Sequence, residues 1–256
     1  MPKVSVIVTT YNRKEFLQET IQSVINQTFQ DFELIVVDNY SNYDFFEHIQ
    51  SFNDPRIRAF QNKNNGIIAV NRNFGIKRAK GEYIAFCDDD DVWMNNKIEI
   101  QIVQLEAQNK DLIYSNSIVF FEAKKQVISH YYLIDNIYCL LYKNKITLSS
   151  VLVRTNPDLF FDETKDFVGI EDYLLWIKLI ILGYNFTFIS EPLLKYRVLD
   201  LSYSRQNKAF MELKTIMALR KIKMQYIFLD VKARIIINYL IGIRLMRYFI
   251  FLFLKK

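Results

Sequence analysis

Residues 81–93 read Gly-Glu-Tyr-Ile-Ala-Phe-Cys-Asp-Asp-Asp-Asp-Val-Trp, an apolar run that ends abruptly in four aspartates. The run from Tyr83 to Cys87 predicts a buried β-strand. Four adjacent carboxylates repel one another, and a bound Mg²⁺ or Mn²⁺ would relieve the repulsion and bridge to phosphate oxygens. The alternative is a solvated acidic turn in which one aspartate caps a helix over 92–104. Taken alone, the acidic cluster leaves both interpretations open.

Strands and helices alternate on both sides of this segment. The apolar patterns predict strands at 4–10, 32–37 and 57–60, and helices at 14–27 and 67–79. This alternation is typical of βαβ units, so we expect an α/β fold with a mostly parallel, Rossmann-like sheet flanked by helices. Polar clusters at 9–13, 38–42 and 88–91 each follow a predicted strand. Because ligands of such sheets bind beyond the carboxyl ends of the strands, the clusters predict one shared binding edge.

The second half of the chain continues with strands at 112–120 and 147–153 and a helix at 170–182. Glu171 and Asp172 stand at the start of that helix. The helix dipole favours carboxylates at such a position, which is a purely structural explanation. The alternative is a general base that accepts the proton of an attacking hydroxyl group.

Several classes of protein are disfavoured. The chain has no G-x-G-x-x-G and no Walker A loop, which argues against a dehydrogenase or a P-loop NTPase. Its two cysteines, Cys87 and Cys139, lack metal-ligand spacing and indicate a reducing compartment. The short apolar start lacks the features of a signal peptide, so we expect a cytoplasmic protein.

The last 54 residues differ from the rest in charge. Residues 203–256 carry 12 Lys and Arg against two Asp and Glu, whereas the first 202 residues carry 21 against 26. Two helices are predicted there, at 208–229 and 231–254. Their uncharged stretches fall short of the ~20 residues that span a bilayer, and the mixture of basic and apolar residues favours an interfacial helix on an anionic membrane. A helical cap on the main domain and a homodimer interface are the alternatives; no nucleic-acid motif is present.

Six segments together resemble family 2 glycosyltransferases, which have the GT-A fold. The matching segments are 4–13 (VSVIVTTYNR), 23–38 (SVINQTFQDFELIVVD), 72–76 (RNFGI), 81–93, 171–176 (EDYLLW) and 191–197 (EPLLKYR). They follow one another in the order typical of the family and cover about residues 3–197. Relatives often carry a His two residues after the Tyr-Arg pair, where this chain has Leu199.

The resemblance implies a role for each site residue. Nucleotide binding is expected of Thr9, Tyr11, Arg13, Asp38, Arg72, Asn73, Asp88 and Asp89. Asp88 and Asp90 match the Asp-x-Asp pair that contacts a Mn²⁺ or Mg²⁺ ion and the diphosphate. Asp172 matches the catalytic base, and Glu171 is the second choice.

We therefore expect a metal-dependent, inverting transfer from a nucleotide-sugar, most naturally a UDP-sugar, to a glycan or lipid-linked oligosaccharide of a bacterial surface polysaccharide. Residues 1–202 are expected to form the GT-A domain, with a nucleotide-binding half at 1–92 and an acceptor half at 93–202. Residues 203–256 are expected to be a helical extension that associates with the cytoplasmic face of the inner membrane or forms a homodimer. The rival hypotheses are a sugar nucleotidyltransferase and a membrane-docked scaffold without activity.

Overall fold

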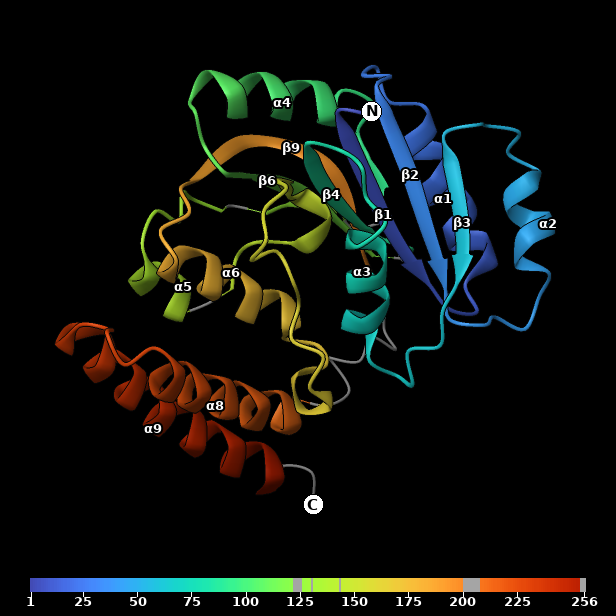
Figure 1. The fold of residues 1–256 in the computed structure, drawn as a ribbon. Coiled ribbons are helices and arrows are strands. Elements are labelled where there is room, and N and C mark those ends of the chain that lie inside the picture. The colour runs from blue at the N-terminus through green and yellow to red at the C-terminus, as the bar shows by residue number, and fades with distance from the viewer. Residues whose placement is uncertain (122–125, 130, 143, 200–207, 254–256) are drawn as a thin grey trace.

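Four parallel strands form the N-terminal half of the sheet. They are β1 (Val4–Thr10), β2 (Phe32–Asp38), β3 (Ile57–Gln61) and β4 (Tyr83–Asp88). In the computed structural model, which describes residues 1–121, 126–129, 131–142, 144–199 and 208–253, they lie side by side in the order β3-β2-β1-β4 (Figure 1). The strand register pairs Thr10 with Asp38, and Thr9 with Asp88. The three polar clusters therefore meet at one edge of the sheet, and the predicted α/β fold is confirmed.

Helices cover both faces of this half because the buried side chains of each strand alternate between two cores. The helices are α1 (Lys14–Ile25), α2 (Phe45–Gln50), α3 (Ile68–Ile76) and α4 (Lys97–Ala107). Val6 and Val8 belong to the same core as Leu17 of α1. Ile7, between them, packs in the opposite core with Ile76 of α3. Parallel strands that are buried on both faces read as continuous apolar runs, which is why the sequence identified them.

Gly81, just before β4, packs against the backbone of β1. A Cβ atom at this position would lie 2.5 Å from the Ser5 backbone nitrogen. Because backbone cannot move aside as a side-chain end can, Gly81→Ala is expected to lower the free energy of unfolding by about 1–3 kcal/mol or more. The matched control is Gly242→Ala in the last helix, where a Cβ meets no atom within 4 Å. That change should stabilise the protein by about 0.5–1 kcal/mol, because alanine favours helix. Urea unfolding midpoints measure both, and equal midpoints would contradict the packing argument.

The C-terminal half of the sheet mixes strand directions. Its strands are β5 (Val92–Trp93), β6 (Leu112–Phe121), β7 (Gln126–Ile128), β8 (Leu152–Arg154) and β9 (Phe186–Val198). The sheet continues from β4 in the order β8-β6-β9-β5. β7 pairs with the later part of β6, opposite to β9. β6 and β9 are parallel, and the other pairs in this half are antiparallel. The helical elements here are α5 (Ile137–Tyr142), η1 (Leu148–Ser150), η2 (Lys165–Phe167) and α6 (Glu171–Ile181).

The extension consists of α8 (Lys208–Gln225) and α9 (Val231–Phe253), which lie side by side against α5 and α6 (Figure 1). Leu219 of α8 and Ile237 of α9 belong to the same core as Trp176 of α6. The expected division between residues 202 and 203 falls outside the described residues. Across the described ranges, no helix combines the length and the hydropathy that a bilayer span requires.

Three predicted segments differ from the structure. The helix expected over 92–104 is wrong at its start: Val92 and Trp93 pair with Lys195 and Leu194 of β9, and α4 begins only at Lys97. No aspartate caps this helix, because Asn96 occupies the position before it. Within 147–153, the first part is the 3₁₀ turn η1 rather than strand. The helix expected over 208–229 ends at Gln225, and residues 226–230 separate it from α9. Asp230 accepts the backbone N–H of Ala233 at 2.7 Å and so caps the start of α9.

Candidate active site

Two arginines form ion pairs with the acidic cluster that ends β4. Arg13, in the loop after β1, donates from one guanidinium nitrogen to Asp89 and to Asp90, both at 2.9 Å. Arg72, in α3, donates to Asp88 at 2.8 Å. The repulsion that the sequence predicts is therefore partly compensated by the protein itself.

Negative charge nevertheless remains in excess here. Burial, and then the charges of Asp88 and Asp89, raise the pKa of Asp90 to about 7. Asp91 is fully buried, and burial raises its pKa well above the ordinary value. One of its carboxylate oxygens accepts the backbone N–H of Arg197 at 3.0 Å, and the other has no hydrogen-bond partner in the described part of the chain. Burial and mutual repulsion thus disfavour the charged forms of these neighbouring carboxylates, and a bound cation would compensate that charge.

Asp88 and Asp90 fit a Mn²⁺ or Mg²⁺ ion that is shared with a substrate. Mg²⁺ is usually held by one or two carboxylates together with substrate phosphates and water. The two side chains are 30% and 16% exposed, so both reach solvent and leave coordination positions for a ligand. Among the residues described, no cluster of three or more His, Cys, Asp or Glu side chains could hold a metal ion.

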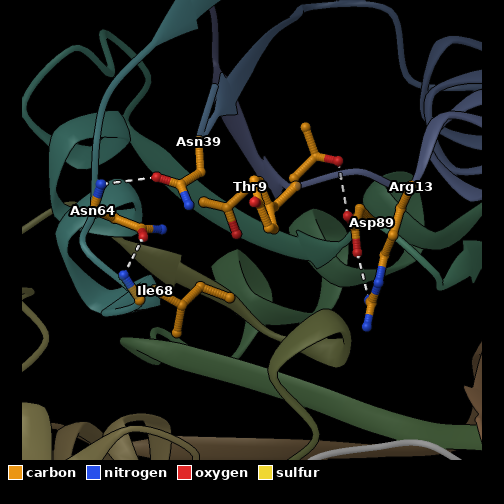
Figure 2. A pocket seen from close by; sticks show the side chains of 9 residues that line it. Thr9, Arg13, Asn39, Asn64, Ile68 and Asp89 are labelled. Atoms are coloured by element: carbon orange, nitrogen blue, oxygen red, sulfur yellow. Dashed lines mark hydrogen bonds and ion pairs between the residues drawn. The ribbon is translucent and has the colours of Figure 1, made fainter. Parts of the chain in front are cut away.

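A cavity of about 280 Å³ opens on one side of the cluster (Figure 2). Its lining residues come from the end of β1, the loops after β1, β2 and β3, the start of α3 and the cluster itself: Thr9, Thr10, Tyr11, Arg13, Asn39, Asn64, Gly66, Ile68 and Asp89. Thr10 donates from its hydroxyl to Asp89 at 2.8 Å. Tyr11 is 53% exposed at the rim, where an aromatic ring is free to stack on a ligand. Four predicted residues, Thr9, Tyr11, Arg13 and Asp89, are thus brought together here.

On the far wall of this cavity, Asn39 belongs to the predicted polar cluster 38–42, whereas Asn64 and Gly66 were not predicted. Asn39 accepts the backbone N–H of Asn64 at 2.9 Å, and Asn64 accepts that of Gly66 at 2.9 Å (Figure 2). Gly66 has φ of +79°, which a residue with a Cβ rarely adopts. The only signal in the sequence was the polar stretch Asn62-Lys-Asn-Asn-Gly66, which is typical of a turn and not of a binding site.

Asp38 and Asn73, two predicted donor-site residues, line neither this cavity nor the second one described below. Asp38 is fully buried and accepts the backbone N–H of Ser41 at 2.9 Å and the Gln61 amide at 3.0 Å. Asn73 is 3% exposed and donates to the Phe161 carbonyl at 2.9 Å. Asp38 thus orders the loop after β2, and Asn73 connects α3 to the segment before η2.

A second cavity, of about 310 Å³, lies on the other side of the cluster. It is lined by Arg72, Asp88, Tyr131, Asn144, Lys145, Ile146, Thr147, Leu148, Gly169, Glu171, Asp172 and Tyr196. Burial, and then the charge of Glu171, raise the pKa of Asp172 to about 7, although Arg72 acts in the opposite direction. A carboxyl group with a pKa near neutrality is suited to accept a proton at physiological pH.

The two carboxylates at the start of α6 have different partners. Arg72 donates to Glu171 at 2.6 Å, and the Gly169 backbone N–H donates to its other oxygen. Glu171 is therefore held in a buried ion pair. Asp172 has no ion pair within the described ranges; its hydrogen bonds come from the Asn144 amide at 3.1 Å and its neighbour's backbone N–H at 2.7 Å. Asp172 is thus better placed than Glu171 to exchange a proton with a ligand.

Residues 5–162 match the family model described as Glycosyl transferase family 2. The Escherichia coli protein WfgD, named as a UDP-Glc:alpha-D-GlcNAc-diphosphoundecaprenol beta-1,3-glucosyltransferase, is 35% identical over 222 residues, which cover 82% of this chain and 82% of that protein. A protein of Rickettsia bellii named as an uncharacterized glycosyltransferase is 44% identical over 108 residues, which cover 42% of this chain and 16% of the larger protein.

Solved structures share the fold at low sequence identity. Staphylococcus aureus TarS 1–349 in complex with UDP-GlcNAc superposes with a TM-score of 0.74 at 19% identity, covering 97% of this chain and 73% of the 1–349 chain. The mannosyltransferase PcManGT of Pyrobaculum calidifontis in complex with GDP-Man and Mn²⁺ gives a TM-score of 0.64 at 16% identity, covering 86% and 64%. These likenesses confirm the predicted GT-A fold. Since the family model spans more than half of the chain and the E. coli relative most of it, the chain belongs to glycosyl transferase family 2 and is a glycosyltransferase.

Proposed function

We propose that this enzyme transfers a sugar from a UDP-sugar, with inversion and with Mn²⁺ or Mg²⁺, to a lipid-linked glycan acceptor. The observation that carries the proposal is the acidic cluster between two cavities. Asp89 lines the cavity of Thr9 and Tyr11, and its neighbour Asp88 lines the cavity of Asp172. A donor whose nucleotide occupies the first cavity therefore presents its diphosphate at the cluster and its sugar toward Asp172.

The chemistry is a single displacement. The acceptor oxygen forms a bond to the anomeric carbon while the bond from that carbon to the diphosphate breaks, and the electron pair leaves with the nucleoside diphosphate. Asp172 takes the proton of the acceptor hydroxyl, as its pKa of about 7 allows. Asp88 and Asp90 would hold the metal ion, which supplies positive charge to the leaving diphosphate. Attack from the side opposite to the leaving group inverts the anomeric configuration.

The names of two E. coli relatives support the donor and acceptor classes. WfgD and WfaP, 35% and 32% identical to this chain, are both named for UDP-Glc as donor and for a GlcNAc-diphosphoundecaprenol acceptor. The experiment is a thermal-shift panel of UDP, GDP, CDP and dTDP with and without Mn²⁺, because a ligand of the native state raises the melting temperature. A Mn²⁺-dependent shift with UDP alone is the expected result. A shift with GDP alone would contradict the proposed donor.

The exposed face of α9 supports association with an anionic membrane. Its apolar side chains fall on one side of the helix at spacings of about one or two turns: Val231, Ile235, Tyr239, Met246, Phe249 and Ile250 are all exposed. Lys232 and Arg247 are exposed on the same helix, Arg247 in an ion pair with Glu212 at 2.9 Å, and Ile227 and Phe228 extend the stripe onto the turn between the helices. An apolar stripe on a helix rich in basic residues suits the interface of an anionic bilayer. We propose that it holds the enzyme at the cytoplasmic face of the inner membrane, where a lipid-linked surface-polysaccharide intermediate is within reach.

Ile235→Glu is expected to reduce binding to vesicles of mixed anionic and zwitterionic phospholipid about tenfold, because one buried isoleucine contributes about 1.5–3 kcal/mol. Vesicle co-sedimentation measures it. The matched control is Val103→Glu on α4, at the opposite end of the molecule (Figure 1). Val103 and Ile235 are both β-branched aliphatic residues and each 62% exposed, so the two changes differ mainly in location. If the protein does not bind vesicles and instead forms a dimer that Ile235→Glu dissociates, the stripe is a subunit interface.

A further inference from the structure

Asn144 contacts the candidate base from a segment that is far away in sequence. Its side-chain amide donates to Asp172 Oδ2 at 3.1 Å. Asn144 belongs to the connection between α5 and η1. Ile146, two residues later in this connection, is buried in the hydrophobic core. We propose that Asn144 is a positioning residue that orients the Asp172 carboxylate and favours its ionised form; this inference rests on the proposed function.

The orientation of the Asn144 amide is fixed by a second contact. Its oxygen accepts the backbone N–H of Ile146 at 3.1 Å. An oxygen that is committed to that N–H cannot face Asp172, so the NH₂ group must. The amide therefore presents a donor and not an acceptor to the carboxylate.

A donor at this place counters the groups that oppose ionisation of Asp172. The charged groups around the carboxyl are Glu171 beside it, Arg72 of α3 and Asp88 of β4. Tyr131, Lys145 and Tyr196 also line the cavity. The two terminal nitrogens of Arg72 donate to Glu171 and to Asp88, so these two carboxylates largely compensate its charge. Within the described ranges, the neutral Asn144 amide is the one side chain that donates a hydrogen bond to Asp172.

Asn144→Asp reverses this contact with little change of shape. The new side chain still accepts the Ile146 N–H, but it presents a carboxylate oxygen where the NH₂ group stood. Asn144→Ala removes the donor without adding charge. Both changes should raise the pKa of Asp172, by about one unit for alanine and by more for aspartate, because a hydrogen bond to the charged form is lost in each and a like charge is gained in the second.

The experiment follows the Asp172 carboxyl directly by ¹³C NMR of protein labelled at aspartate Cγ. The signal is assigned by its absence in Asp172→Asn and titrated in the native chain and both variants. The matched control is Asn136→Asp: Asn136 lies just before α5, at the other end of that helix from Asn144, accepts the Cys139 backbone N–H and does not line the cavity. The expected result is a raised pKa in both Asn144 variants and an unchanged one in Asn136→Asp.

A second readout separates this inference from the proposed function. The rate of UDP release from UDP-glucose is measured against pH. The pH at which this rate falls to half on the acidic side should rise in the Asn144 variants by as much as the pKa of Asp172 rises. An Asp172 pKa that stays unchanged in both variants overturns the inference while leaving the base assignment intact. If Asp172→Asn retains full activity, the proposed base is wrong, whatever the titrations show. If Asn144→Asp does not fold, Asn144→Ala alone decides by the same criterion.

Discussion

Replacing Asp172 by asparagine is expected to lower kcat for sugar transfer about a thousandfold, within the ~10²–10⁴ range typical of a lost general base. Asparagine keeps the shape of the side chain but cannot accept the acceptor's proton. Donor binding should persist, because the nucleotide cavity is built from the loops after β1, β2 and β3 and does not include Asp172. UDP release measures the first effect, and the Mn²⁺-dependent thermal shift with UDP measures the second.

Asp166→Asn is the matched control for this experiment. Asp166 is exposed in η2, six residues before Asp172, and lines neither cavity. The same chemical change there should leave both the rate and the thermal shift as they are. An Asp172→Asn enzyme with native kcat would transfer the role to another group, whereas a native chain without any turnover would favour the scaffold hypothesis.

The strands and their common edge could be predicted because each is a local pattern. A strand buried on both faces must be apolar throughout, and its polar successor marks the carboxyl end, as Cys87 and Asp88 illustrate. The strand β5 could not be predicted this way. Val92 and Trp93 look like the start of the following helix, and only pairing with residues 194 and 195, a hundred positions away, makes them a strand.

The site could be predicted in outline but not in its contacts. The motifs gave the residue types, whereas the partners depend on the packing of distant segments. Arg13 reaches Asp89 and Asp90 across 76 and 77 positions of sequence. Asn144, which contacts Asp172, stands in a connection that has neither periodicity nor a motif. The different roles of Glu171, in an ion pair, and Asp172, as the proposed base, likewise depend on Arg72, which forms an ion pair only with Glu171.

Replacing Asp90 by asparagine is expected to stabilise the free protein and to abolish the stabilisation that UDP and Mn²⁺ provide. Burial, Asp88 and Asp89 raise the folded-state pKa of Asp90 to about 7, whereas the unfolded value is about 3.9. A group with a raised folded-state pKa contributes its full stability below the unfolded pKa and loses it as the pH rises through the folded pKa. At pH 8 the ionised Asp90 therefore lowers the free energy of unfolding of the free protein. Removing its charge should raise the melting temperature by about 2–4 °C for each kcal/mol by which the free energy of unfolding increases.

The ligand reverses the sign of this effect. If Asp90 binds the metal ion, its charge is the source of affinity, and the native protein should gain about 2.7 kcal/mol of stability at a hundredfold excess of ligand over Kd, whereas the variant should gain almost none. Asp31→Asn, at an exposed position before β2, is the matched control and should change neither measurement. A variant that keeps the Mn²⁺-dependent shift would remove Asp90 from the metal site. A free variant that melts lower than the native chain would mean that the contact between Asp90 and Arg13 outweighs the repulsion within the cluster. The two melting curves together thus distinguish a carboxylate that is retained for a ligand from one that is retained for the fold.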